Sequence, residues 1–150
     1  MKKTFLSFLL VMVSVSFTLA GCNTGDENTN SDWKGEFTKA QKIDVVSPDS
    51  SDVIMTISED AEIENFIESL KIDDWNVADI PSDANKGIAF KMYQEVGASG
   101  EGDLEEVATM TTFKDTSYIE FSFQGFSFNF KVPEEVIEYL NGYSESGGNS

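Results

Sequence analysis

The sequence predicts an α+β fold in two layers, in which a mostly antiparallel sheet carries two helices on one face. Two patterns lead to this prediction. Several short segments alternate apolar and polar residues, as strands do when one side of a sheet is buried. Two other segments repeat apolar residues every three or four positions, as helices do when they cover a sheet. The chain has 150 residues, so we expect one domain of ordinary size.

The first two strands are expected at residues 43–45 and 53–57. Both segments alternate apolar and polar side chains, and the polar segment 47–51 between them includes a proline. The pattern therefore predicts two strands joined by a short turn.

A helix is predicted next, beginning at residues 58–60. Acidic side chains cluster at its N-terminal end, where the helix dipole favours them. Its apolar residues form a single stripe: Ile63, Phe66, Ile67 and Leu70. Residues 75–80 are expected to be extended, and a turn with Pro81 and Gly87 follows them.

Two more strands are predicted at residues 88–92 and 107–113, on either side of the loop 97–103. The clearest local pattern comes after them, where residues 119–123 and 126–130 alternate apolar and polar side chains around Gln124-Gly125. A tight turn there would pair three sets of apolar residues: Phe123 with Phe126, Phe121 with Phe128, and Ile119 with Phe130. We expect this hairpin to be the centre of the sheet's buried face, and a pocket for a lipid or an aromatic ligand is the alternative.

The last predicted element is a helix that begins at Pro133 and has an apolar face formed by Val136, Ile137 and Leu140. Asn141-Gly142 is expected to end it. The folded domain is therefore expected to span residues 32–143, with a flexible tail at 144–150.

The N-terminus has the layout of an export signal. Lys2 and Lys3 precede the apolar run 5–19, which is shorter than the ~20 residues that a membrane-spanning helix needs. The segment Leu19-Ala20-Gly21-Cys22 resembles the lipobox of bacterial lipoprotein precursors. This resemblance implies that residues 1–21 are a signal peptide, that cleavage occurs before Cys22, and that fatty acyl groups are attached to that cysteine. The alternative is an ordinary secretory leader with an unrelated cysteine.

The same resemblance implies a lipid-anchored protein on the extracytoplasmic side of the cell membrane. Residues 22–31 are polar and without apolar periodicity, so they are expected to be a tether. Trp33 and Phe37 follow the tether, and either begin the domain or lie at the membrane interface. We favour docking on the domain, because acidic neighbours oppose approach to anionic lipid.

The composition excludes several functions. The chain has no His and no Arg, and its 27 acidic residues against 10 basic residues give a net charge of -17. Nucleic acid is therefore excluded as a partner, because its binding depends on Lys and Arg contacts to phosphates. Without His, neither a Ser-His-Asp nor a Cys-His mechanism can be assembled. A pair of carboxylates remains the only route to catalysis, so we expect no enzyme activity and no cofactor.

Calcium is the metal ion that the sequence fits best, although we expect no metal site overall. Asp73, Asp74, Asp79 and Asp83 supply hard oxygen ligands in one segment, and residues 101–106 form a second acidic cluster. Neither segment has the spacing of an EF-hand loop, and solvation is the ordinary fate of such clusters.

These observations predict a non-catalytic binding or interaction module of the cell envelope, whose partner is a protein or a peptide. Two alternatives remain: an immunity or inhibitor lipoprotein that captures a cationic peptide or enzyme, and a carboxylate-based hydrolase. The order of leader, tether, strands, acidic helix, aromatic hairpin and final helix also resembles small lipoproteins of Gram-positive bacteria. That resemblance implies no particular activity.

Overall fold

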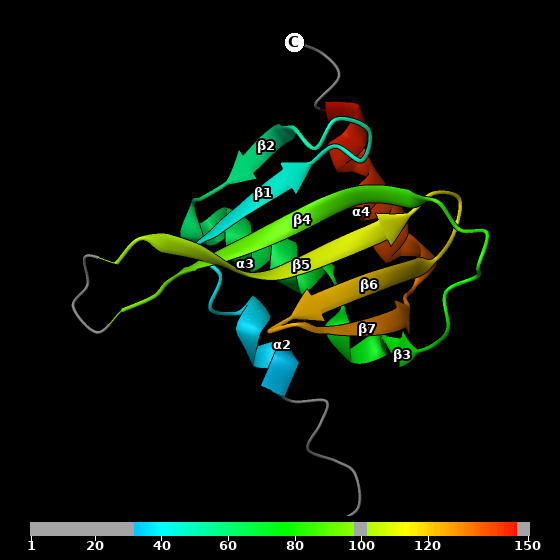
Figure 1. Cartoon of the computed structure of the whole chain (residues 1–150), viewed down its shortest axis with the longest axis horizontal. Helices are drawn as coiled ribbons and strands as arrows, with labels where there is room; N and C mark the ends of the chain where they lie inside the picture. Colours follow the sequence, from blue (N-terminus) through cyan, green and yellow to red (C-terminus); the bar gives the residue numbers. More distant parts are fainter. Residues whose placement is uncertain (1–31, 98–101, 147–150) are drawn as a thin grey trace, which may run out of the picture.

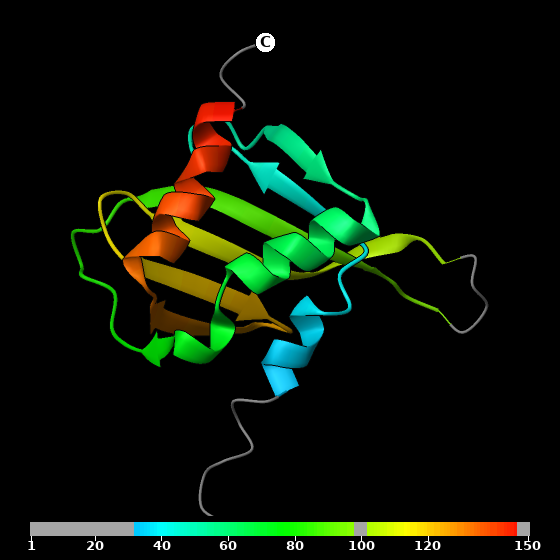
Figure 2. The same cartoon turned by 180° about the vertical axis from the view of Figure 1, so that it is seen from behind.

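The computed structural model describes residues 32–97 and 102–146. Its centre is a seven-stranded sheet with the strand order β2-β1-β4-β5-β6-β7-β3, in which every neighbouring pair is antiparallel. The helices lie together on one face of this sheet (Figures 1 and 2). The predicted α+β class, with a mostly antiparallel sheet and helices on one face, is confirmed.

The predicted strands are all present, and two of them are longer than the periodicity suggested. The strands are β1 (Lys42–Val46), β2 (Val53–Ile57), β3 (Asn76–Val77), β4 (Lys86–Glu95), β5 (Leu104–Phe113), β6 (Tyr118–Phe123) and β7 (Phe126–Lys131). The helices are α2 (Asp32–Phe37), α3 (Asp60–Ser69) and α4 (Glu134–Ser146), and a short 3-10 helix, η1, covers Ile72–Asp74. The additional residues of β4 and β5 form a two-stranded arm, in which Glu95 pairs with Leu104 (Figure 1).

The hairpin of β6 and β7 has the predicted register. Phe123 pairs with Phe126, Phe121 with Phe128 and Ile119 with Phe130. Gln124 and Gly125 at the turn have φ values of 49° and 82°, the two consecutive positive values that a type I′ hairpin turn requires.

The hairpin does not, however, form the centre of the buried face. The fourth of the seven strands is β5, and the hairpin lies to one side of it. Phe126 is 67% exposed and Phe128 is 40% exposed, whereas Phe121 and Phe130 are buried. The reason is that the covering layer ends here: Trp33 packs on Phe121 and Phe130, and β3 pairs with only two residues of β7.

Trp33 and Phe37 dock on the domain, as favoured from the sequence. They belong to α2, a third helix that the sequence analysis did not identify, and both are buried against the sheet. The ring of Phe37 stacks on Phe121 with a centroid distance of 4.6 Å, and the ring of Trp33 stacks on Trp75 at 5.6 Å. These contacts close the apolar core at the end of the sheet that carries the hairpin.

The final helix continues past its predicted end. Asn141 and Gly142 lie inside α4, which extends to Ser146, so the predicted tail at 144–150 is wrong for residues 144–146. Tyr143 explains the extension, because it packs edge-on against Phe66 and Phe90 in the core. Burying a large side chain contributes up to about 1.5–3 kcal/mol, which outweighs the cost of about 1 kcal/mol for a glycine within a helix. The rest of the tail, residues 147–150, lies outside the described residues.

Candidate functional site

One face of the sheet, the side toward the viewer in Figure 1, is not covered by the helices. The strand register joins six polar side chains of this face into one row across six strands: Thr56, Asp44, Lys91, Thr109, Ser122 and Ser127. We call this row, together with its neighbours Lys42, Tyr93, Glu106 and Glu120, the open face. Residues such as Asp44, Lys91 and Thr109 alternate with buried residues along their strands, so the same alternation that builds the core also builds much of this surface.

Asp44 is the most buried charged residue of the open face. It is only 6% exposed, accepts a hydrogen bond from Thr56 Oγ1 at 2.8 Å, and pairs with Lys42 Nζ at 3.0 Å. Burial raises the pKa of Asp44, but the bonds from Thr56 and Lys42 and the charge of Lys42 lower it further, so the net pKa falls below the ordinary value of 3.8. Lys42 Nζ also lies 4.1 Å from the ring centroid of Tyr93.

A second ion pair occupies the neighbouring strands. Lys91 Nζ lies 3.0 Å from Glu106 Oε2, and Thr109 Oγ1 donates a hydrogen bond to Glu106 Oε1 at 2.7 Å. Burial raises the pKa of Glu106, but the bonds from Thr109 and Lys91 outweigh it and the net pKa is lowered. The pKa of Lys91 is raised, chiefly by its hydrogen bond to Glu106.

Tyr93 lies between these two ion pairs. Burial raises its pKa, and the negative charges of Asp44 and Glu106 add to this effect. At neutral pH the phenol is therefore protonated, the two carboxylates are ionised and Lys91 is charged. Lys86 and Glu120 form a third, looser pair at 3.6 Å. The three lysines and three carboxylates of these pairs give the open face a balanced charge, and the side chains of each pair hold one another in place.

A hollow lies at one end of the open face. It has a volume of about 490 Å³, and Glu106, Thr109 and Ser122 belong both to its lining and to the open face. The other wall is formed by Glu36 of α2 and Gln94 of β4, where Gln94 Nε2 donates to the Glu36 carbonyl at 3.2 Å and to its Oε2 at 3.3 Å. The half-buried ring of Phe123 also lines it. Such a hollow offers hydroxyl, amide and carboxylate groups beside one apolar surface, a combination suited to binding.

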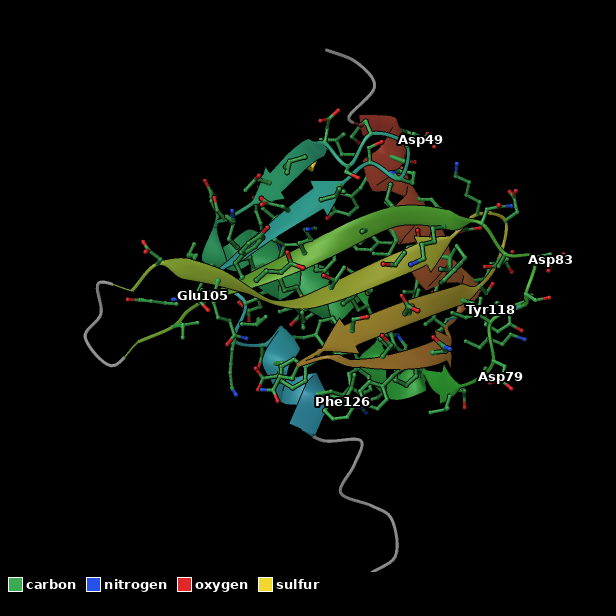
Figure 3. The ribbon with its side chains drawn as sticks, in the orientation of Figure 1. Asp49, Asp79, Asp83, Glu105, Tyr118 and Phe126 are labelled. Atoms are coloured by element: carbon green, nitrogen blue, oxygen red, sulfur yellow. The ribbon has the colours of Figure 1, made fainter. Side chains whose placement is uncertain are left out.

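The four calcium candidates are not brought together. Asp73 and Asp74 lie in η1, where Asp73 Oδ1 accepts a hydrogen bond from Lys34 Nζ at 2.7 Å. Asp79 and Asp83 lie in the loop between β3 and β4, well separated from each other (Figure 3). Within residues 32–97 and 102–146, no three Asp, Glu, Cys or His residues are grouped so that they could hold a metal ion. The calcium hypothesis therefore gains no geometrical support from the described residues.

Cys22, the predicted lipidation residue, lies outside the described residues, as do the signal peptide and the tether. Glu101 of the second acidic cluster is also outside them. Within that cluster Glu105 lies on the arm of β5 (Figure 3) and pairs with Gln94 in the register, whereas Glu106 binds Lys91.

Asp44 and Lys91 were not predicted as site residues from the sequence, and Glu106 was named only as part of the second acidic cluster. A signal was present, because Asp44 stands between Ile43 and Val45, and Lys91 between Phe90 and Met92. A charged residue flanked by core residues in a strand must face away from the core. What the sequence lacks is the strand order, which decides that these charges are neighbours.

No helix in the part of the chain that the structure describes is long and apolar enough to cross a membrane. Comparison of the chain with protein-family models, with curated proteins and with solved structures found no match.

Proposed function

We propose that this chain is a lipid-anchored protein on the extracytoplasmic side of the cell membrane, whose folded domain is a non-catalytic binding module for another protein or a peptide. The open face is the binding surface in this proposal. The observation that carries the proposal is the preorganised row of polar side chains on an uncovered sheet, next to a hollow of about 490 Å³. Side chains that are already held in place lose little conformational entropy when a partner binds.

The charge state of this surface favours binding over proton transfer. A hydrolase with two carboxylates needs one of them to be protonated near neutral pH, which requires a raised pKa. The two described carboxyl groups with clearly shifted pKa values, Asp44 and Glu106, are both shifted downward. Hence the surface supports electrostatic recognition better than it supports acid–base chemistry.

The membrane anchor is supported by the lipobox-like segment that ends at Cys22. Intact mass spectrometry of the protein extracted from membranes of its natural host tests it. The expected mass is that of residues 22–150 plus the added acyl groups, and a Cys22→Ser variant should retain residues 1–21 without acylation. A wild-type mass that includes residues 1–21, or a free thiol at Cys22, would contradict the anchor.

The binding surface is tested by site-specific crosslinking in intact host cells. A photoreactive residue at Ser127, on the open face, is expected to give a discrete adduct with a partner, whereas the same residue at Glu138, on α4, is expected to give none. The double variant Lys91→Glu with Glu106→Lys keeps an ion pair but exchanges its ends, so it should abolish the Ser127 adduct while the protein stays folded. Equal adducts from Ser127 and Glu138 would refute the assignment of the open face.

Capture of a cationic peptide or enzyme is a second candidate function, and a specific observation favours it. The helices α3 and α4 carry four carboxylates each and no lysine, whereas the open face has balanced charge. Lys71 pairs with Glu135, and an excess of carboxylates remains on the helical side of the domain, where it can attract a basic partner. Such binding should weaken steeply with added salt, and an affinity that stays constant from low to high ionic strength would rule it out.

A further inference from the structure

A second hollow lies on the helical side of the domain, between β2, α3 and α4. Its volume is about 310 Å³, which is at the lower end of the range of about 300–1,000 Å³ found for small-ligand sites. Its lining comes from three elements: Met55, Thr56 and Ile57 of β2, Glu62 and Asn65 of α3, and Tyr139 and Tyr143 of α4. We call it the tyrosine hollow. The helices α3 and α4 that line it cover the side of the sheet opposite to the open face (Figure 2), and Thr56 on the edge strand β2 belongs to both surfaces.

An aromatic cluster forms one side of the tyrosine hollow. The hydroxyl groups of Tyr139 and Tyr143 are hydrogen-bonded at 2.9 Å, and their rings are perpendicular with centroids 5.5 Å apart. The ring of Tyr143 is also perpendicular to that of Phe90 at 5.6 Å, and Phe66 lies 5.9 Å away. The two tyrosines are therefore held by the core from below while they line the hollow from one side. A fixed aromatic surface of this kind is what a cation–π interaction requires.

The charge that lines the tyrosine hollow is negative. Glu62 is the one charged residue among the described residues that line it. Burial raises the pKa of Tyr143 well above its ordinary value, and the hydrogen bond between the Tyr143 and Tyr139 hydroxyl groups adds to the effect, so the phenol stays neutral. The helices on both sides carry further carboxylates, such as Glu59 before α3 and Glu138 on α4, and no lysine. Within the described lining, nothing neutralises the carboxylate of Glu62 as Lys42 neutralises Asp44 on the open face.

We propose that the tyrosine hollow binds the cationic side chain, lysine or arginine, of a basic peptide. The aliphatic stem of such a side chain would pack on Met55 and the tyrosine rings, and its charged end would meet the carboxylate of Glu62 and the amide oxygen of Asn65. An anionic or neutral polar ligand fits less well, because the described lining holds a carboxylate and no cationic donor. The inference rests on the second candidate function, capture of a cationic partner, and assigns that function to one place on the domain.

The test uses the full chain in non-ionic detergent and a fluorescent hexalysine peptide, with fluorescence anisotropy at low ionic strength as the readout. The Nε-acetylated form of the same peptide, which has lost its charge, is expected not to bind. Glu62→Gln should weaken binding roughly tenfold, because a charge-assisted hydrogen bond is lost. The matched control, Glu138→Gln, removes the same charge from an exposed position outside the hollow and should change the affinity less than about twofold.

The contribution of the rings is tested at Tyr139. Tyr139→Phe keeps the ring and should bind nearly as well as the wild type, whereas Tyr139→Leu should weaken binding roughly threefold to tenfold. Circular dichroism checks that each variant is folded, and if Tyr139→Leu is not, the pair Glu62→Gln and Glu138→Gln still decides.

Two results would overturn the site, and they are distinguishable. Equal weakening by Glu62→Gln and Glu138→Gln would show that the peptide is held by the general acidity of the helices. Capture of a cationic partner would then stand without the tyrosine hollow. Absence of hexalysine binding by the wild-type chain at low salt would overturn both the hollow and the second candidate function.

Discussion

Asp44 is a nearly buried carboxylate whose environment stabilises its charged form. A carboxylate that is nearly buried is costly unless hydrogen bonds and an opposite charge compensate for the lost hydration. Thr56 and Lys42 supply that compensation from the neighbouring strand and from the same strand. The net effect is a lowered pKa, which means that the ionised form stabilises the folded state.

This arrangement predicts a pH-dependent effect for Asp44→Asn. The folded pKa lies below the unfolded value of about 3.8, so the contribution of the ionised carboxylate is complete above pH ~4 and is lost as the pH falls through the folded pKa. The variant should be less stable than the wild type by about 1–3 kcal/mol at pH ~7, and this difference should be smaller at pH ~3, below the unfolded pKa. Urea denaturation at both pH values measures it. Asp83→Asn, in an exposed loop, is the control and should show little difference at either pH, while a constant deficit for Asp44→Asn would contradict the assignment.

Gly87 allows a second test at the residue scale. A Cβ atom at this position would lie 2.4 Å from Thr112 Oγ1 and 3.3 Å from the Thr112 carbonyl oxygen. Gly87→Ala should therefore destabilise the protein by about 1–3 kcal/mol. In a Thr112→Ala background, where the closest atom is gone, the same change should cost about 1 kcal/mol less. A thermodynamic cycle with the four proteins measures this coupling, and additive effects would show that the clash is relieved in another way.

The elements show which parts of the fold can be predicted from local sequence. The register of the β6–β7 hairpin was predictable because a two-residue turn and strict alternation leave one solution. The sheet order was not, because pairings such as β1 with β4 join residues about fifty positions apart and leave no local signal. Alternation along a strand shows which of its residues face solvent. It does not show that Asp44 and Lys91 are neighbours, because that depends on the pairing of β1 with β4. The end of α4 was missed because Tyr143 is held by tertiary contacts that outweigh local propensity.

Replacing glycine by alanine should have opposite effects on stability at two positions, Gly125 and Gly142. Gly125 has a φ of 82° in the hairpin turn, so Gly125→Ala should destabilise the protein by about 1 kcal/mol or more. Gly142 lies inside α4, and a Cβ atom added there would meet no atom within 4 Å, so Gly142→Ala should stabilise the protein by up to about 1 kcal/mol. Thermal denaturation followed by circular dichroism measures both. Shifts of the same sign would show that the backbone at one of the two glycines has a different conformation.

At the scale of the whole molecule, the two sides of the sheet have different electrostatic characters. The helices α3 and α4 carry eight carboxylates, of which Glu135 pairs with Lys71, while the open face pairs its charges. This segregation could not be seen in the sequence, where acidic residues are scattered along the whole chain. It appears only when the order of the strands and the side taken by the helices are known.

The net charge of -17 predicts that salt stabilises the folded domain. Repulsion among the carboxylates of α3 and α4 is screened as the Debye length falls, so the free energy of unfolding should rise by roughly 0.5–1 kcal/mol between about 20 mM and about 500 mM NaCl. Glu64→Gln, which removes one charge from the exposed side of α3, should raise stability at low salt and have a smaller effect at high salt. A stability that falls with added NaCl would mean that the ion pairs outweigh the repulsion.

The short β3 strand has a consequence for the behaviour of the protein at high concentration. Because β3 accompanies only the C-terminal end of β7, the N-terminal half of that strand, with the exposed rings of Phe126 and Phe128, has no neighbouring strand on that side within the described part of the chain. The unpaired backbone groups at this strand edge can form hydrogen bonds with a second molecule, which favours edge-to-edge association. The strong negative charge keeps like molecules apart in dilute buffer, and concentrated salt removes this protection, so the same conditions that stabilise the monomer also promote aggregation.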